Sequence, residues 1–178
     1  MIKPKIILIG AGGHGKVLVD AIILQGKYEI AGFVDSKIDI GTEIFRNYRV
    51  ILQQNELSKI SNYADFFIVA IGNNTIREKI YAEAEKYIKP AIIIHPSAII
   101  GSDVSIGDGT VVLINSVINT CSRIGKNAIV NSGVIIDHEC TIGSHIHLSI
   151  GTLVGSNTVI GDNITTSIGQ HIQSFSKI

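Results

Sequence analysis

The chain has 178 residues, of which 15 are basic and 15 acidic, so its formal net charge is zero. The balance of charge argues against nucleic acid or an anionic membrane surface as a partner. A hydrophobic content of 46% is typical of a folded globular protein and excludes a disordered chain. The longest uncharged run, 140–161, contains histidines, an asparagine and several glycines, so we do not expect it to cross a membrane.

The first residues and the cysteines exclude further classes. Residues 1–10 lack the long apolar stretch and the small-residue cleavage site of a signal peptide. The two cysteines, Cys121 and Cys140, have neither the spacing of a zinc site nor the number needed for a disulfide framework. We therefore expect a cytoplasmic protein that needs no metal.

Composition differs sharply between the two halves of the chain. Residues 91–178 hold eight of the 30 charged residues and one of the ten aromatic residues, Phe175. The whole chain contains 37 isoleucines and no tryptophan. Such a division predicts two architectures, and we place the domains at 1–90 and 91–178.

The first half alternates short apolar runs with helical patterns. The predicted strands are 5–9, 29–34 and 66–71, and the predicted helices are 16–24 and 75–89. We expect the first helix to be mostly buried and the second to bury a stripe made of Ile76, Ile80, Ala84 and Tyr87. This βαβαβ order predicts a parallel sheet with right-handed crossovers, as in Rossmann-like domains.

A glycine-rich turn, Gly10 to Gly15, joins the first predicted strand to the first predicted helix. Such a turn exposes backbone N–H groups at the positive end of a helix, and glycine lets a pyrophosphate approach the backbone closely. Asp35 follows the second strand, where an acid usually meets a ribose hydroxyl. These features predict a nucleotide ligand, with a purely structural tight turn as the alternative.

The second half is a repeat of six residues. Every sixth residue from Ile94 to Ile160 is Ile, Leu or Val, and the residue that follows is usually Gly or a polar residue that tolerates a tight corner. Coiled coils and β-sandwiches do not have this period. It is typical of a β-helix built from hexapeptides, in which three faces close a coil of about 18 residues. Because the interior of such a coil is narrow, it also explains the excess of isoleucine.

Several segments together resemble one known family. The segments are 12–17 (GGHGKV), 32–35 (GFVD), 70–74 (AIGNN), 95–98 (HPSA) and 137–143 (DHECTIG). They are similar to those of the hexapeptide-repeat acetyltransferases that include sialic acid O-acetyltransferases and the bacillosamine-type N-acetyltransferases of UDP-linked 4-amino sugars. The resemblance implies a Rossmann-like domain followed by a left-handed parallel β-helix. It also implies acetyl-CoA as cosubstrate, a UDP-sugar or sialic acid as acceptor, and a homotrimer.

His138 is the candidate general base. Acetyl transfer requires removal of a proton from the acceptor, and histidine suits this task near neutral pH. His138 follows a predicted corner and has acidic neighbours on both sides, although these residues alone also fit an exposed corner with no catalytic role. The resemblance makes His138 the base and Glu139 the acid that raises its basicity. It places Asn131 near the acceptor and His147 on the acetyl-CoA side.

The resemblance also implies a nucleotide pocket in the first half. Its expected residues are Gly12, Gly13, His14, Asp35 and Gly72, with His14 contacting the phosphates. Ser36 stands where some relatives carry a second acid, which leaves selectivity for uracil or ribose open. Asn73, Asn74 and Arg77 are candidates for the same cleft, and capping of a helix explains the two asparagines equally well.

The end of the repeat departs from the family pattern. Family members continue past the last coil into a glycine- and proline-containing loop that helps hold coenzyme A. Here the six-residue pattern falters at Thr166, and Ile168 and Gly169 are the remaining candidates for contact with the cofactor. We therefore expect weaker binding of acetyl-CoA, or loss of activity.

Two further functions remain as alternatives. A zinc hydro-lyase like the γ-class carbonic anhydrases would use three histidines, for which His138, His145 and His147 are available at a different spacing. A non-catalytic nucleotide-sugar-binding protein with a degenerate β-helix would explain the faltering repeat.

Overall fold

The structure is a computed structural model and describes residues 2–178. The chain forms two compact units, Met1–Ala91 and Ile92–Ile178. No helix within the described residues is long and apolar enough to cross a membrane.

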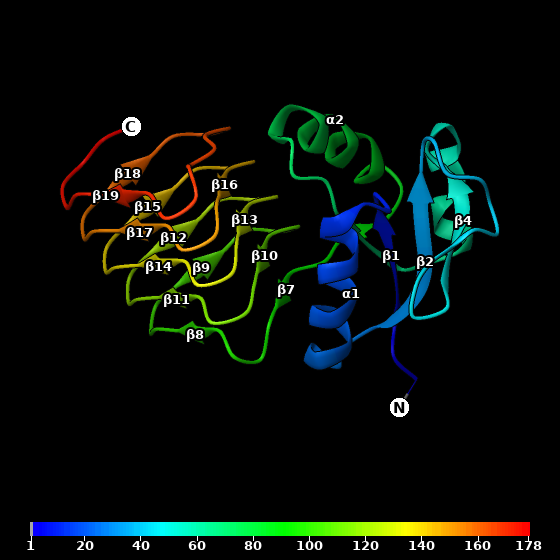
Figure 1. The fold of residues 1–178 in the computed structure, drawn as a ribbon, viewed down its shortest axis with the longest axis horizontal. Coiled ribbons are helices and arrows are strands. Elements are labelled where there is room, and N and C mark those ends of the chain that lie inside the picture. The colour runs from blue at the N-terminus through cyan, green and yellow to red at the C-terminus, as the bar shows by residue number, and fades with distance from the viewer. Residues whose placement is uncertain (1) are drawn as a thin grey trace. The chain divides into compact units, whose positions relative to one another are not determined.

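A six-stranded sheet forms the centre of the first unit, in the order β3-β4-β2-β1-β5-β6. The strands are β1 (Lys5–Ile9), β2 (Glu29–Asp35), β3 (Glu43–Phe45), β4 (Tyr48–Gln53), β5 (Phe66–Val69) and β6 (Lys89–Pro90). All pairs are parallel except β3 with β4. Ile9 lies opposite both Val34 and Val69, so β1, β2 and β5 end at the same edge of the sheet. Strands β1, β2 and β4 are labelled in Figure 1. The predicted parallel sheet is confirmed.

Helix α1 (Gly13–Gln25) and helix α2 (Asn74–Ala84) pack on this sheet with one face each. The expectation that the first helix is mostly buried is wrong, because Val17, Ile23 and Leu24 are between 42% and 58% exposed. The predicted stripe of α2 is also wrong at its ends. Ile76 is half exposed, and the buried face is instead made of Arg77, Ile80, Tyr81 and Ala84.

The sequence patterns did not predict the segment between β2 and β5. It forms the hairpin of β3 and β4 and then a 3₁₀ segment, η1 (Gln54–Asn62). Arg46 and Asn47 at the tip of the hairpin both have positive φ, at 51° and 66°, as a tight hairpin turn requires. Arg49 donates to the carboxylate of Glu43 across the two strands at 3.1 Å.

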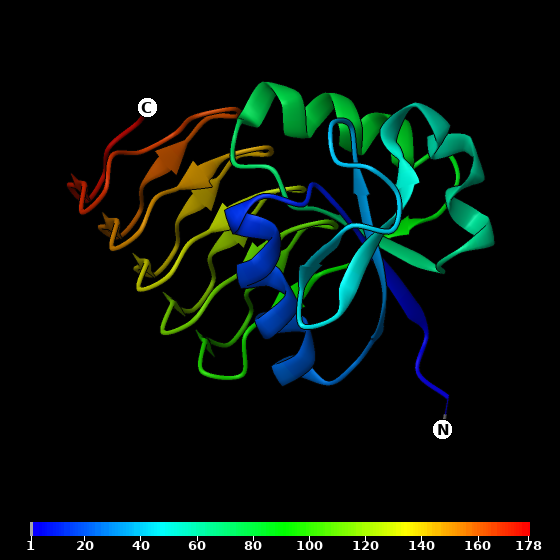
Figure 2. The ribbon, with the colours of Figure 1, turned by 45° about the vertical axis from the view of Figure 1, so that its right-hand side comes forward.

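The second unit is a parallel β-helix with three faces (Figure 2). The first face contains β7 (Ile93–Ile94), β10 (Val111–Val112), β13 (Ile129–Val130) and β16 (His147–Leu148). The second face contains β8 (Ile99–Ile100), β11 (Val117–Ile118), β14 (Ile135–Ile136), β17 (Leu153–Val154) and β19 (His171–Ile172). The third face contains β9 (Ser105–Ile106), β12 (Arg123–Ile124), β15 (Thr141–Ile142) and β18 (Val159–Ile160).

The six-residue repeat corresponds to the register of these faces. Val112 pairs with Ile94 on one side and Val130 on the other, so that residues 18 apart stack in the core. Glycine is required where the third face turns into the first. A Cβ built on Gly143 would lie 2.5 Å from the carbonyl carbon of Gly161, because successive coils approach each other closely at this corner.

The coils continue beyond the position where the sequence pattern falters. Thr166 takes the place of an apolar residue and is 4% exposed. Its hydroxyl accepts the N–H of Ser149 at 2.8 Å and hydrogen-bonds Thr152 Oγ1 at 2.8 Å, so the buried oxygen is satisfied. Ile172 of β19 then returns to the core. The break in the pattern is therefore a polar substitution inside a regular coil.

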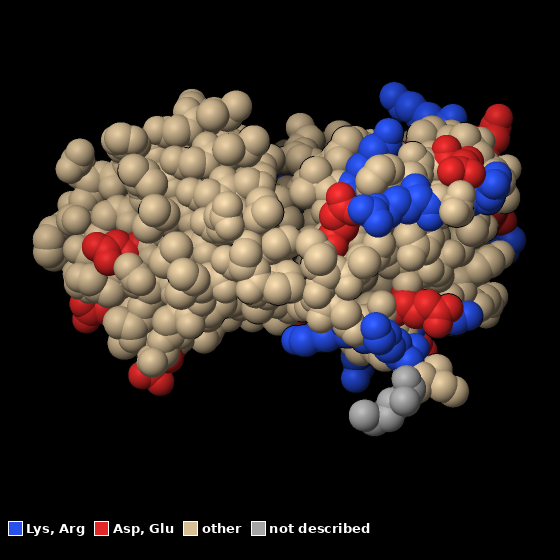
Figure 3. Space-filling view, turned by 60° about the horizontal axis from the view of Figure 1, so that its bottom comes forward, with Lys and Arg blue, Asp and Glu red and all other residues tan. Residues whose placement is uncertain are grey.

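The difference in charge between the two halves is visible on the surface. On the face shown in Figure 3, the β-helix carries a few acidic side chains, whereas the first unit carries many interspersed Lys, Arg, Asp and Glu. The β-helix therefore presents a largely uncharged surface on this face.

Candidate functional site

A pocket of about 300 Å³ opens at the edge where β1, β2 and β5 end. It is lined by residues 10–14 of the glycine-rich turn, by Asp35 and Ser36 after β2, by Gln54 of η1, and by residues 70–72 after β5. The structure thus brings together all six residues that the sequence analysis assigned to a nucleotide pocket, which are Gly12, Gly13, His14, Asp35, Ser36 and Gly72.

The glycines of the turn have different structural roles. A Cβ on Gly15 would lie 2.6 Å from the carbonyl oxygen of Gly10, so glycine is required there by packing. A Cβ on Gly12 or Gly13 would meet no atom within 4 Å, and neither residue has a positive φ. Packing therefore does not explain glycine at these two positions, whereas close approach of a ligand to the N-terminus of α1 does.

Asp35 connects the end of β2 to the glycine-rich turn. Its Oδ2 accepts the N–H of Ala11 at 3.0 Å, and its Oδ1 accepts the N–H groups of Lys37 at 2.9 Å and Ile38 at 3.3 Å. Burial alone would raise the pKa of Asp35, but these N–H groups hold it below its ordinary value. The carboxylate is therefore ionised near neutral pH and shapes the pocket, and its predicted contact with a ribose hydroxyl stays a prediction.

The polar residues at the start of α2 have different roles: Asn73 caps the helix, and Arg77 is buried. The side chain of Asn73 accepts the N–H of Ile76 at 3.0 Å, which confirms the capping interpretation for this residue. Arg77 does not line the pocket and is 1% exposed. Burial lowers the pKa of its guanidinium to about 10, so the group is still charged near neutral pH.

A second group of polar residues lies at the corner between β14 and β15. The backbone of Glu139 is left-handed, with φ of 58°, and this turns its side chain back toward His138. The Nδ1 atom of His138 lies 2.9 Å from Glu139 Oε2. Both side chains are about half exposed. Strand alternation would separate these neighbours, and the left-handed corner is what brings them together.

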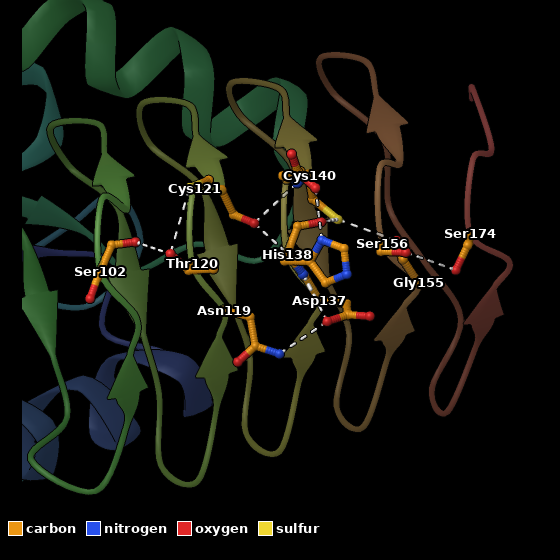
Figure 4. Close-up of polar contacts among 12 residues, drawn as sticks. Ser102, Asn119, Thr120, Cys121, Asp137, His138, Cys140, Gly155, Ser156 and Ser174 are labelled. Carbon is orange, nitrogen blue, oxygen red and sulfur yellow. Dashed lines mark hydrogen bonds and ion pairs between the residues drawn. The ribbon is translucent and has the colours of Figure 1, made fainter.

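Asp137 and Asn119 hold the backbone of this corner. Asp137 Oδ1 accepts the N–H of His138 at 2.8 Å and the Nδ2 of Asn119 at 3.1 Å (Figure 4). These two donors, the N–H of His138 first, lower the pKa of Asp137. The sequence analysis missed this role of the pair, although its spacing of 18 residues is one coil of the repeat.

Asn131 lies at another corner, where the first face turns into the second, and His147 lies beside it on strand β16 of the first face. Asn131 Nδ2 is 3.1 Å from His147 Nε2. Ile168, which is 77% exposed, and Gly169, with φ of 67°, belong to the same corner in a later coil. Because the strands of the second face separate this corner from that of His138, a single β-helix does not join all the predicted catalytic and cofactor residues.

The histidines of the second unit have different surroundings. His145 is 7% exposed, and its Nδ1 lies 2.8 Å from Asn127 Nδ2. Within residues 2–178, no group of three or more His, Cys, Asp or Glu side chains is arranged to hold a metal ion. Cys140 is buried, which raises the pKa of its thiol, and its Sγ donates to the carbonyl of Gly155 at 3.2 Å.

A cleft of about 370 Å³ lies beside the His138 corner on the second face. Asn119 and Asp137 form its polar wall, and Ile135 and Leu153 form its apolar floor. The cleft thus lies directly beside the residues that hold the His138 backbone.

Comparison with known proteins places both units in one family. Residues 5–84 match the family model described as the PglD N-terminal domain. The whole chain resembles the acetyltransferase domain of PglB from Neisseria gonorrhoeae FA1090, solved in complex with acetyl coenzyme A. The identity is 30%, the match covers 96% of this chain and 93% of that one, and the TM-score is 0.74. The chain belongs to the bacillosamine-type sugar N-acetyltransferases.

Two further proteins are also similar to this chain. PerB from Caulobacter crescentus, solved in complex with CoA and GDP-perosamine, is 28% identical, with 97% of this chain and 84% of that chain covered and a TM-score of 0.72. A UDP-N-acetylbacillosamine N-acetyltransferase from Bacillus subtilis (strain 168) is 32% identical over 111 residues. That alignment covers 60% of this chain and about half the length of the curated relative.

Proposed function

We propose that the protein transfers the acetyl group of acetyl-CoA to the amino group of a nucleotide-linked amino sugar, a UDP-4-amino sugar in the first instance. The observation that carries the proposal is the contact of His138 Nδ1 with the carboxylate of Glu139 at 2.9 Å. Family membership supports the same reaction, since relatives have been solved with acetyl coenzyme A and with GDP-perosamine.

The geometry of His138 suits a general base. A carboxylate only accepts hydrogen bonds, so Nδ1 of His138 carries the proton and Nε2 presents its lone pair. Nε2 takes a proton from the amine of the sugar while the nitrogen of that amine attacks the thioester carbonyl. The C–S bond then breaks, the C–N bond remains, and the imidazolium returns the proton to the departing thiolate. Glu139 stabilises the imidazolium between these two steps.

The pocket of the first unit is the proposed site for the nucleotide. The N–H groups at the start of α1 and the open space at Gly12 and Gly13 fit a pyrophosphate, with His14 beside it. Asp35, Ser36 and Gly72 complete the lining, with Asp35 proposed to accept from a ribose hydroxyl. Since relatives carry names with both UDP and GDP sugars, the base is the part of the ligand most in need of a direct test.

We further propose that the protein acts as a homotrimer and is cytoplasmic. The outward residues of the second face form an exposed apolar ladder, with Ile99, Ile135 and Leu153 between 37% and 64% exposed. The corner of His138 and the corner of Asn131 and His147 flank this face. A second copy packed on the ladder would bring its His147 corner next to the His138 corner of the first copy and so complete the site. His147, Ile168 and Gly169 would then lie on the acetyl-CoA side.

The test is a thiol-release assay with acetyl-CoA and a panel of acceptors: UDP-4-amino sugars, GDP-perosamine and sialic acid. We expect turnover with an amino sugar and loss of turnover in His138→Ala. The matched control is His95→Asn, a partly exposed histidine of the first coil that bonds Ser97 in its own turn at 2.8 Å. Full turnover in His138→Ala would contradict the mechanism, and turnover with sialic acid alone would replace the amine by a hydroxyl acceptor.

A further inference from the structure

Arg77 is a buried cation on the face of α2 that packs into the first unit. Its side chain is 1% exposed, although an arginine is costly to bury unless its N–H groups find acceptors. The guanidinium remains protonated near neutral pH. The acceptors that it uses therefore indicate what the residue does.

Two of these acceptors are consecutive carbonyl groups of the chain. Nη1 of Arg77 donates to the carbonyl oxygens of Ile71 at 3.1 Å and of Gly72 at 3.0 Å. Nη2 donates to Asn74 Oδ1 at 2.7 Å. In a strand, successive carbonyls point to opposite sides, so their convergence on one nitrogen fixes a turn directly after β5.

The same two residues form part of the wall of the nucleotide pocket. A carbonyl oxygen carries a partial negative charge, and a trans peptide bond holds its N–H on the opposite side. Both oxygens are directed at a buried guanidinium that does not itself line the pocket, so the negative ends of these two peptide dipoles are turned toward Arg77 rather than toward a ligand in the pocket. An anionic ligand in the pocket is therefore not repelled by the carbonyl oxygens of Ile71 and Gly72, as it would be if these oxygens pointed into the pocket.

We propose that Arg77 is a positioning residue for the nucleotide. It acts from behind the wall, where it holds the carbonyls of Ile71 and Gly72 away from the anionic ligand. The inference rests on the proposed function, because it requires that the pocket of the first unit take a nucleotide. It adds that the affinity of this pocket depends on a residue that does not touch the ligand.

The experiment compares the binding of UDP and GDP to the full chain and to three variants by isothermal titration. Arg77→Met removes the donors and the charge. Asn74→Ala is a milder change that removes one acceptor and leaves the arginine in place. The matched control is Arg49→Met, since Arg49 also donates to a backbone carbonyl, that of Gly41 at 2.8 Å, but on the exposed β3–β4 hairpin.

We expect Arg77→Met to weaken nucleotide binding about tenfold or more, equivalent to the loss of one charge-assisted hydrogen bond, and Asn74→Ala to weaken it roughly threefold. In turnover, the KM for the nucleotide sugar rises while kcat and the KM for acetyl-CoA change less than about twofold. A general structural defect would instead lower kcat and the fraction of folded protein together.

Three results are decisive. A folded Arg77→Met that binds nucleotide as tightly as the wild type overturns the inference. If Arg77→Met does not fold, unchanged binding in Asn74→Ala overturns it. If the wild-type protein binds neither UDP nor GDP, the proposed nucleotide site itself fails, and this outcome is distinct from the first two.

Discussion

The substitution Gly13→Ala separates the folding role of the glycine-rich turn from its role in binding. A Cβ on Gly13 meets no atom within 4 Å, and the residue is the first of α1 with an ordinary φ. Replacing such a glycine by alanine stabilises a protein by about 0.4–1 kcal/mol through the unfolded chain. In a domain of about 90 residues that corresponds to a rise in Tm of roughly 2–8 °C.

The same methyl group would occupy the space proposed for the approach of a pyrophosphate to the N–H groups of α1. Loss of one charge-assisted hydrogen bond costs roughly 1.5–3 kcal/mol, which is about a 10- to 150-fold rise in Kd. Differential scanning fluorimetry gives the stability and titration with UDP gives the affinity. We therefore expect Gly13→Ala to melt higher than the wild type and to bind UDP more weakly.

The matched variant is Gly15→Ala in the same turn. Its Cβ would lie 2.6 Å from the carbonyl oxygen of Gly10 and 3.1 Å from the ring of Phe33, so we expect it to destabilise the fold by about 1–3 kcal/mol. A Gly13→Ala variant with wild-type affinity for UDP would refute the placement of the phosphates at this turn. A lower Tm in Gly13→Ala would refute the conclusion that the space beside the Gly13 Cα is free of protein atoms.

Three further predictions concern the rest of the molecule. Glu139→Gln removes the charge that stabilises the imidazolium, so kcat should fall roughly 10- to 100-fold while Asp103→Asn, at the equivalent corner of the first coil, leaves it unchanged in the thiol-release assay. Gly143→Ala forces the coil of Gly161 away, and urea unfolding should show a loss of about 1–3 kcal/mol; an unchanged midpoint would contradict the close approach. The pKa of Asp35 is lowered in the folded state, so its stabilising contribution is present above about pH 4 and is lost as the pH falls through the lower folded value. The difference in Tm between the wild type and Asp35→Asn should therefore shrink from pH 6 to pH 3, and a constant difference would argue against the carboxylate contacts.

Much of the fold was predictable because strict periods leave few alternatives. The six-residue repeat predicted that Ile94, Val112 and Val130 stack in register, and the glycine-rich turn predicted a pocket where β1 ends. The hairpin of β3 and β4 was missed because two short strands with polar residues have no such period. Thr166 suggested from the sequence that the repeat falters there. The coil nevertheless continues, because a hydroxyl with two hydrogen-bond partners can replace an apolar side chain.

The candidate sites were predicted in part. Neighbouring residues, such as His138 and Glu139, were found from the sequence, since a corner brings neighbours together. The pair of Asn119 and Asp137 was missed because contact across coils depends on which way each corner side chain points. Arg77 was a candidate for the cleft, whereas its place on the buried face of α2 directs it toward backbone carbonyls, which the sequence pattern of a charged residue does not indicate.

The stacking of coils also determines how firmly the His138 corner is held. The N–H of Glu139 donates to the carbonyl of Thr120 in the preceding coil, and the carbonyl of His138 accepts the N–H of Asn157 in the following one. In a solenoid each repeat is stabilised by its two neighbours, and motion is greatest toward the ends of the stack. The backbone of the proposed base is thus fixed from both sides, so selection can change the exposed side chains around it without loosening its geometry.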